Sequence, residues 1–174
     1  METAEHGILD EILKFYRGYY DVSIEEKKEL PLYAKADFHQ VNEKYVLSRK
    51  ANLWRAQVHE YVYFFEMDCL EREMFEQCVT YAHRDGMQKI EPGPEHMYSY
   101  ITVVFVCNRT EADALKAAKR CRIHKDFKLS FHGWMDVKTA ILNKGEGTVV
   151  TNRCGKDLTK LFHKFLQSKP KDKK

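Results

Sequence analysis

Alternating polar residues between positions 128 and 138 form the arrangement in this chain that is best suited to binding. They are Lys128, Ser130, His132, Trp134, Asp136 and Lys138. In a β-strand, residues of one parity project from one face, about 7 Å apart. Cations at that spacing, with an indole between them, suit a surface that follows a phosphate backbone and stacks a base. A solvated strand face, with the indole covered by a neighbouring element, is the alternative interpretation.

More basic residues flank this segment. Arg120, Arg122 and Lys125 precede it, and Arg153 and Lys156 lie near the start of a predicted last helix. Backbone amides at a helix N-terminus favour anions. The spacing therefore predicts a place for phosphate or sulfate, with a charged helix end that only caps itself as the alternative.

The charge of the chain is divided along its length. Residues 116–174 carry 16 Lys and Arg against 5 Asp and Glu, whereas residues 1–115 carry 13 against 21. Such asymmetry favours a polyanionic partner, nucleic acid or another polyanion, for the basic third. The hypothesis is a non-catalytic binding module. A homodimer that pairs the acidic part of one copy with the basic part of another would use the same charges.

Length and composition predict the architecture that must position these residues. A chain of 174 residues, 44% hydrophobic, is large enough for one domain with a real core. We expect a single globular domain over residues 1–168 and a disordered basic tail over residues 169–174. The fold class expected is mixed α/β, with one mixed sheet and helices packed against it.

The apolar periodicity predicts the individual elements. Helical spacing is found in residues 4–20, 69–83, 110–121 and 155–167, and an Arg-Asp-Gly sequence at 84–86 is expected to stop the second helix. Strands are predicted at 32–39, 44–50 and 58–66 as an antiparallel three-strand meander, with a turn at 40–43, and residues 21–31 are predicted to be a charged connection. Residues 98–107, apolar on both faces, are predicted to be the central strand. A long strand over 127–141, bent at Gly133, and a return strand at 148–151 complete the sheet.

Two polar sites on neighbouring predicted strands resemble a known family. Asp37 lies on the first strand, and Ser48-Arg49-Lys50 ends the second. Together with the order of elements over residues 4–107, they resemble the core of the restriction-endonuclease-like superfamily. In that superfamily an Asp on one strand and a Glu-x-Lys on the next hold a magnesium ion and orient water beside the scissile phosphate.

The resemblance implies a divergent metal-dependent nuclease with a magnesium cofactor as the alternative to a binding module. Ser48 stands where the second acid is found in the family, and a hard divalent cation needs more than one anionic oxygen. Glu66 or Asp68 would have to supply that oxygen, with Lys50 as the basic partner. Without such a site, Asp37 and Lys50 are polar residues on a solvated sheet face.

Several classes of protein are not expected from this sequence. The five cysteines are widely spaced and contain no Cys-x-x-Cys pair, so we expect reduced thiols and no zinc site. No glycine-rich phosphate loop or nucleophile elbow is present, and no cofactor is predicted. No long apolar stretch or basic leader occurs. We therefore expect a cytoplasmic protein without membrane association.

Overall fold

The computed structural model describes residues 7–26, 29–44 and 54–167. Within that part of the chain it contains four helices and one sheet of seven strands. In chain order the elements are α1 (Gly7–Tyr16), β1 (Asp21–Ile24), β2 (Leu32–Lys44), β3 (Trp54–Leu70), α2 (Arg72–Lys89), β4 (His96–Thr110), α3 (Ala112–Arg120), β5 (His124–Asp126), β6 (Trp134–Asn143), β7 (Thr148–Thr151) and α4 (Lys156–Gln167). The mixed α/β fold expected from the sequence is confirmed.

The sheet combines an antiparallel half with a parallel half. Its strand order is β1-β2-β3-β4-β6-β5, and β7 also pairs with β6. β2 pairs antiparallel with both β1 and β3, whereas β4 pairs parallel with both β3 and β6. β5 and β7 pair antiparallel with different stretches of β6. The three-strand meander is therefore present, but its members are β1, β2 and β3.

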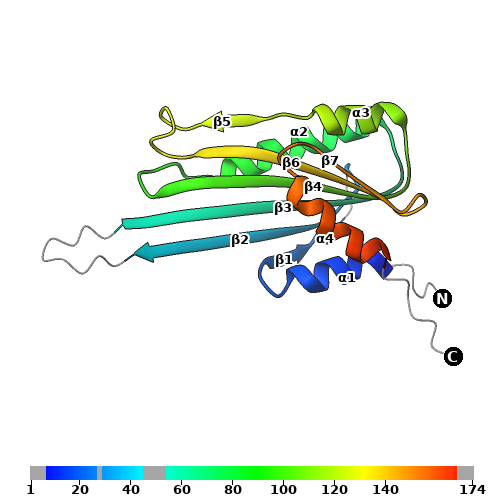
Figure 1. Cartoon of the computed structure of the whole chain (residues 1–174), viewed down its shortest axis with the longest axis horizontal. Helices are drawn as coiled ribbons and strands as arrows, with labels where there is room; N and C mark the ends of the chain where they lie inside the picture. The colour runs from blue at the N-terminus through cyan, green and yellow to red at the C-terminus, as the bar shows by residue number, and fades with distance from the viewer. Residues whose placement is uncertain (1–6, 27–28, 45–53, 168–174) are drawn as a thin grey trace, which may run out of the picture.

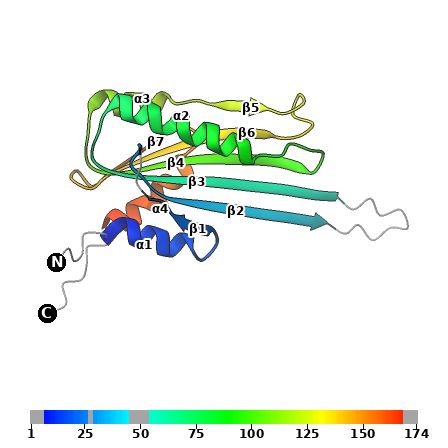
Figure 2. The same ribbon diagram turned by 180° about the vertical axis from the view of Figure 1, so that it is seen from behind.

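Helices cover both faces of the sheet. α2 and α3 lie on one face, here called the α2 face, and α1 and α4 lie on the other, here called the α4 face (Figures 1 and 2). β4 supplies both cores: Ile101, Val103 and Phe105 join the core under α2, while Val104 and Val106 join the core under α4. The prediction of a central strand that is buried on both sides is confirmed.

The helices cover only part of the sheet. In Figure 1, α1 and α4 occupy one end of the α4 face, and β2, β3 and the first half of β4 extend beyond them. Helical spacing explains how α4 packs, since Leu158 and Phe162 lie one turn apart and are both buried. Within the described ranges, one end of the α4 face is thus a sheet surface without a helix above it.

Two local predictions at the antiparallel end of the sheet were wrong, each because strand pairing overrides a local signal. β2 runs through the expected turn at 40–43, where Gln40 pairs with Val58 and Asn42 pairs with Ala56. Most of the predicted strand 44–50 lies outside the described residues. Residues 21–31, expected to be a connection only, contain β1, which pairs with β2.

The second helix continues past the expected stop at 84–86. A Cβ atom on Gly86 would lie 2.7 Å from Cδ1 of Ile101, so this glycine serves close packing of α2 on the sheet. Asp85 accepts hydrogen bonds from the Tyr63 hydroxyl at 2.7 Å and the Lys35 ammonium at 3.3 Å. A turn-forming sequence is therefore held in a helix by its tertiary contacts.

The long strand predicted over 127–141 is a turn followed by one strand, β6. Lys128, Leu129 and Ser130 have φ angles of 49°, 54° and 68°, which lie in the left-handed region, so the chain reverses there. β5 ends before this turn, and β6 begins directly after Gly133. The alternation of residue types across the segment was correct only for its second half.

Candidate functional site

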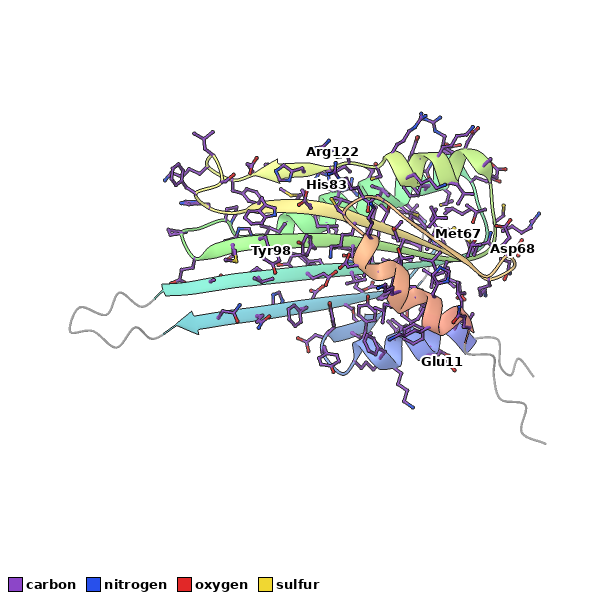
Figure 3. All side chains as sticks on the ribbon, in the orientation of Figure 1. Glu11, Met67, Asp68, His83, Tyr98 and Arg122 are labelled. Atoms are coloured by element: carbon purple, nitrogen blue, oxygen red, sulfur yellow. The ribbon has the colours of Figure 1, made fainter. Side chains whose placement is uncertain are left out.

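The cations predicted to share one strand face are distributed over three places. Arg120 and Arg122 lie at the end of α3, Lys125 and Lys128 lie on β5 and the turn after it, and Arg153 and Lys156 lie at the start of α4. All six side chains are exposed. Figure 3 labels Arg122 on the segment that joins α3 to β5.

A groove of about 590 Å³ lies between α2 and α3 and is lined by four cationic side chains. They are Arg72, Lys116, Arg120 and Arg122. The two carboxylates of the groove are already engaged, because Arg72 Nε lies 2.8 Å from Glu76 and Lys116 Nζ lies 3.3 Å from Asp113. Arg120 and Arg122 form no ion pair with any residue that the structure describes. Two guanidinium groups therefore remain available at the groove.

β5 continues this positive charge along the outer edge of the sheet. All three of its residues are exposed. Lys125 lies on the α2 face, because its register partner Met135 belongs to the core under α2. Burial, and then the charge of the Lys125 ammonium, lower the pKa of His83 on α2. We call the surface formed by Lys116, Arg120, Arg122, Lys125 and Lys128 the basic edge.

Asn152 joins the basic edge to the start of α4. Its buried Nδ2 donates to the carbonyl of Cys121 at 3.1 Å and to that of Val137 at 2.8 Å. Its Oδ1 accepts from the amides of Gly155 at 2.9 Å and Thr139 at 3.1 Å. One side chain thus fixes the end of α3, the middle of β6 and the start of α4.

The same junction brings Arg122 close to Arg153. Burial raises the pKa of the Cys154 thiol, and the charges of Lys138, Arg122 and Arg153 partly oppose that rise. Cations that are more than thirty residues apart in sequence therefore act on one thiol. The residues predicted around the start of the last helix lie near the basic edge.

The indole and the last cation of the predicted set have side chains on the α4 face, and Lys138 lies beside the start of α4. Trp134 stacks on Tyr98 with ring centroids 5.6 Å apart, and Tyr98 contacts Tyr100 at 5.1 Å. Lys138 Nζ lies 3.9 Å from the centroid of Tyr100 and 2.8 Å from Asp157. Lys138 is buried. The prediction of Lys138 as an accessible contact is therefore wrong, because its charge is already paired.

Lys128 and His132 do not share the strand face of Trp134. Both lie in the turn between β5 and β6, and the carbonyl of His132 lies 2.6 Å from Nδ1 of His96. Tyr98 and Tyr100 were missed by the sequence analysis, although they share the parity of Thr102 on the predicted central strand. An aromatic residue at every second position was the signal that could have identified them.

The residues proposed for a nuclease site do not come together. Asp37 lies on the α2 face, where both of its carboxylate oxygens are 3.0 Å from Lys89 Nζ. Glu66 has the parity of Phe64, which packs on the opposite face. Asp68 is seven residues beyond Tyr61, the cross-strand partner of Asp37, or about 23 Å along the strand.

The environment of Asp68 is also different from that of a metal ligand, because its carboxylate accepts from Asn108 and Arg109, both at 3.0 Å. Lys50 lies outside the described residues. Within the described part of the chain, no three His, Cys, Asp or Glu side chains gather as a metal site requires. The five cysteines are free thiols.

A histidine cluster lies on the α2 face near the ends of β2, β3 and β4. Nδ1 of His39 lies 2.7 Å from Nδ1 of His59, and the His59 ring stacks on His96 with centroids 6.0 Å apart. Burial, and then the charges of His39 and His96, lower the pKa of His59. In the unfolded chain His59 would be protonated near pH 6.5. Between that pH and the lower pKa of His59 in the folded protein, the unfolded state therefore binds more protons than the folded state.

The stabilising contribution of His59 is therefore present above about pH 6.5 and is lost as the pH falls through its folded pKa. We expect His59→Gln to reduce the drop in unfolding free energy between about pH 7.5 and about pH 5.5, measured by urea denaturation. His124→Gln should instead increase this drop in unfolding free energy. Hydrogen bonds to Asp136 and Asp126 raise the pKa of His124, so its contribution is full below about pH 6.5 and is lost at higher pH. Equal pH dependence in wild type and His59→Gln would contradict this assignment.

Comparison with known proteins places the chain in a family. Residues 5–164 match the family model described as a domain of unknown function, DUF8052, so the chain belongs to that family. No curated protein and no solved structure matches the chain. Among the described residues, no helix is long and apolar enough to cross a membrane.

Proposed function

We propose that this protein is a non-catalytic binding module that holds nucleic acid through its phosphates along the basic edge. The observation that carries the proposal is the pair of exposed guanidinium groups, Arg120 and Arg122, at a groove whose carboxylates already have partners. Guanidinium groups are well suited to phosphate because they donate two parallel hydrogen bonds.

The layout of the surrounding charges supports the same proposal. Segment 116–128 carries six Lys and Arg against one acid, Asp126. That acid accepts a hydrogen bond from Ser130 and is 3.1 Å from Nε2 of His124, and these contacts hold its pKa below the usual range. The segment therefore offers a run of cations with little opposing charge. Such a run attracts a polyanion with a strong dependence on salt.

Replacing Arg120 and Arg122 together with alanine should weaken binding of a fluorescein-labelled oligonucleotide on the order of tenfold at low salt, since two phosphate contacts are lost. The slope of log affinity against log salt should become shallower by about 1.4 for a single strand, or about 1.8 for a duplex. Fluorescence anisotropy over a salt series measures both quantities.

Lys160→Ala with Lys164→Ala is the matched control, because it removes two exposed positive charges from α4 at a distance from the groove. This variant should keep nearly the wild-type affinity and slope. An equal loss in both double variants would count against a defined basic edge. Salt-dependent self-association of the protein without ligand, abolished by the arginine changes, would favour the homodimer instead.

A further inference from the structure

The turn between β5 and β6 holds two large apolar side chains in solvent. Leu129 is 88% exposed and Phe131 is 78% exposed. The backbone is locked beneath them, since the amide of His132 donates to Phe127 O at 3.1 Å and the amide of Phe127 donates to Gly133 O at 2.9 Å. Left-handed φ angles at non-glycine residues cost free energy and tend to occur at ligand-binding segments.

Phe131 lines a hollow at the end of the sheet. Phe131 and Trp134 belong to the lining of a pocket of about 170 Å³, together with Ala56 and Met97. Leu129 does not contribute to it. Phe131 and Trp134 therefore border the same hollow, at the end of the sheet.

From this hollow, flat rings continue over the open part of the α4 face. Trp134 and Tyr98 are stacked, with an angle of 27° between their planes, and Tyr100 follows on the same strand. Figure 3 labels Tyr98 there, in the region that no helix covers. Each of these rings is only partly buried, although the Lys138 ammonium occupies one face of Tyr100. Partly exposed aromatic rings provide surfaces on which bases of a single strand can stack.

The charges around this row suit a polyanion. Lys128 lies in the turn that carries Phe131, and Lys156 lies at the start of α4, next to Asp157, which binds Lys138. Glu95 also lines the hollow, and it accepts a hydrogen bond from Gln57 at 3.2 Å. Two acids beside the row are engaged: Asp136 lies 2.7 Å from Nδ1 of His124, and Asp157 lies 2.8 Å from Lys138 Nζ. These contacts reduce the electrostatic repulsion between the carboxylates of Asp136 and Asp157 and a phosphate.

We infer that the ligand is single-stranded nucleic acid, with its phosphates on the basic edge and one base in the hollow between Phe131 and Trp134. This inference rests on the proposed function and assigns the strandedness of its ligand. A duplex would contribute phosphates only, because its bases are already stacked on each other. An anionic membrane surface would also suit cations beside exposed apolar side chains, but lipid needs apolar area and not a row of planar rings.

Tryptophan fluorescence tests the inference directly. The chain has two tryptophans, so in a Trp54→Phe background the emission reports Trp134 alone. A thymidine oligonucleotide of about 12 nucleotides, within the usual range of site sizes, should quench this emission. An abasic deoxyribose-phosphate oligomer of the same length should bind at least about fivefold more weakly and should not quench it, because stacking of even one base contributes at least that factor.

Phe131→Ala and Leu129→Ala form a matched pair at the same turn. We expect Phe131→Ala to lower affinity for the thymidine oligomer about fivefold or more and to leave affinity for the abasic oligomer unchanged. Leu129→Ala should change neither affinity. Circular dichroism and thermal unfolding of both variants would show that the turn and fold are retained.

Other outcomes would overturn the inference. Equal affinity for both oligomers without quenching, or tighter binding of a duplex, would reject base stacking while leaving phosphate binding by the basic edge intact. Absence of binding to either oligomer at low salt would reject the proposed function itself. Co-sedimentation with vesicles rich in phosphatidylserine, lost equally in both turn variants, would assign this turn to a membrane surface.

Discussion

Gly133→Ala is expected to lower the free energy of unfolding by about 3 to 5 kcal/mol, from a left-handed backbone and a steric overlap acting together. Gly133 has a φ angle of 77°. A Cβ atom there would lie 2.2 Å from the carbonyl oxygen of Met97 and 2.6 Å from that of His96. These are backbone atoms of β4, so the contact cannot be relieved by rotating a side chain.

Gly147→Ala is the control that separates the two causes. Gly147 has a similar φ angle of 66°, but nothing lies within 4 Å of the position where its Cβ would be. Gly147→Ala should lower the free energy of unfolding by about 1 kcal/mol, from the backbone conformation alone. Urea denaturation of both variants measures the difference. Similar losses in the two variants would contradict the view that the close approach to β4 dominates.

Because Gly133 lies between Phe131 and Trp134, its substitution also bears on the proposed ligand site. A shift of the turn away from β4 would move Phe131 relative to Trp134. Any Gly133→Ala protein that remains folded should therefore lose the quenching of Trp134 by the thymidine oligomer, while Gly147→Ala should retain it.

Asn152→Ala is the second change with a large expected effect, about 3 to 5 kcal/mol of unfolding free energy. Its side chain makes four hydrogen bonds to backbone groups and is almost fully buried. Each backbone group left buried without a partner costs about 1 to 3 kcal/mol, and partial relaxation keeps the total below the sum. Asn152→Asp should cost at least as much, because a carboxylate would face the carbonyls of Cys121 and Val137 without a proton to donate.

Asn108→Ala is a suitable control, because Asn108 is exposed and its side chain donates one hydrogen bond, to Asp68 at 3.0 Å. This change should cost less than about 1 kcal/mol. Urea denaturation gives the free energies, and hydrogen exchange at the amides of Thr139 and Gly155 should accelerate only in the Asn152 variants. Equal stabilities of Asn108→Ala and Asn152→Ala would show that the buried hydrogen bonds are not limiting.

Much of the fold could be predicted from local patterns. The α4 helix follows from five apolar residues at helical spacing, and the central strand β4 follows from a run that is apolar at both parities. The helical spacing reflects burial of one face of α4, and the continuous apolar run reflects burial of both faces of β4. An element that packs along its whole length has a regular pattern of apolar residues in the sequence. These elements could therefore be identified without tertiary information.

The errors occurred where a distant contact decides the local conformation. Gly86 has the sequence context of a helix end, but Ile101 packs where its side chain would be, and α2 continues. Residues 127–133 alternate as a strand would, but Gly133 packs against the carbonyls of Met97 and His96, and the chain turns there. A glycine can either end a helix or strand or allow another segment to pack closely against the backbone. Only the residues packed against the glycine distinguish the two cases.

The sequence by itself determined that this is a mixed α/β domain whose last third carries excess positive charge. It did so because composition and apolar period are properties of the chain alone. The tertiary structure decided which cations remain available. Asp157 binds Lys138 and Asn152 holds the start of α4 beside Arg122, whereas Arg120 and Arg122 face a groove whose acids are paired. Pairing of charges depends on distances of a few ångströms between residues far apart in the chain, and no local pattern encodes them.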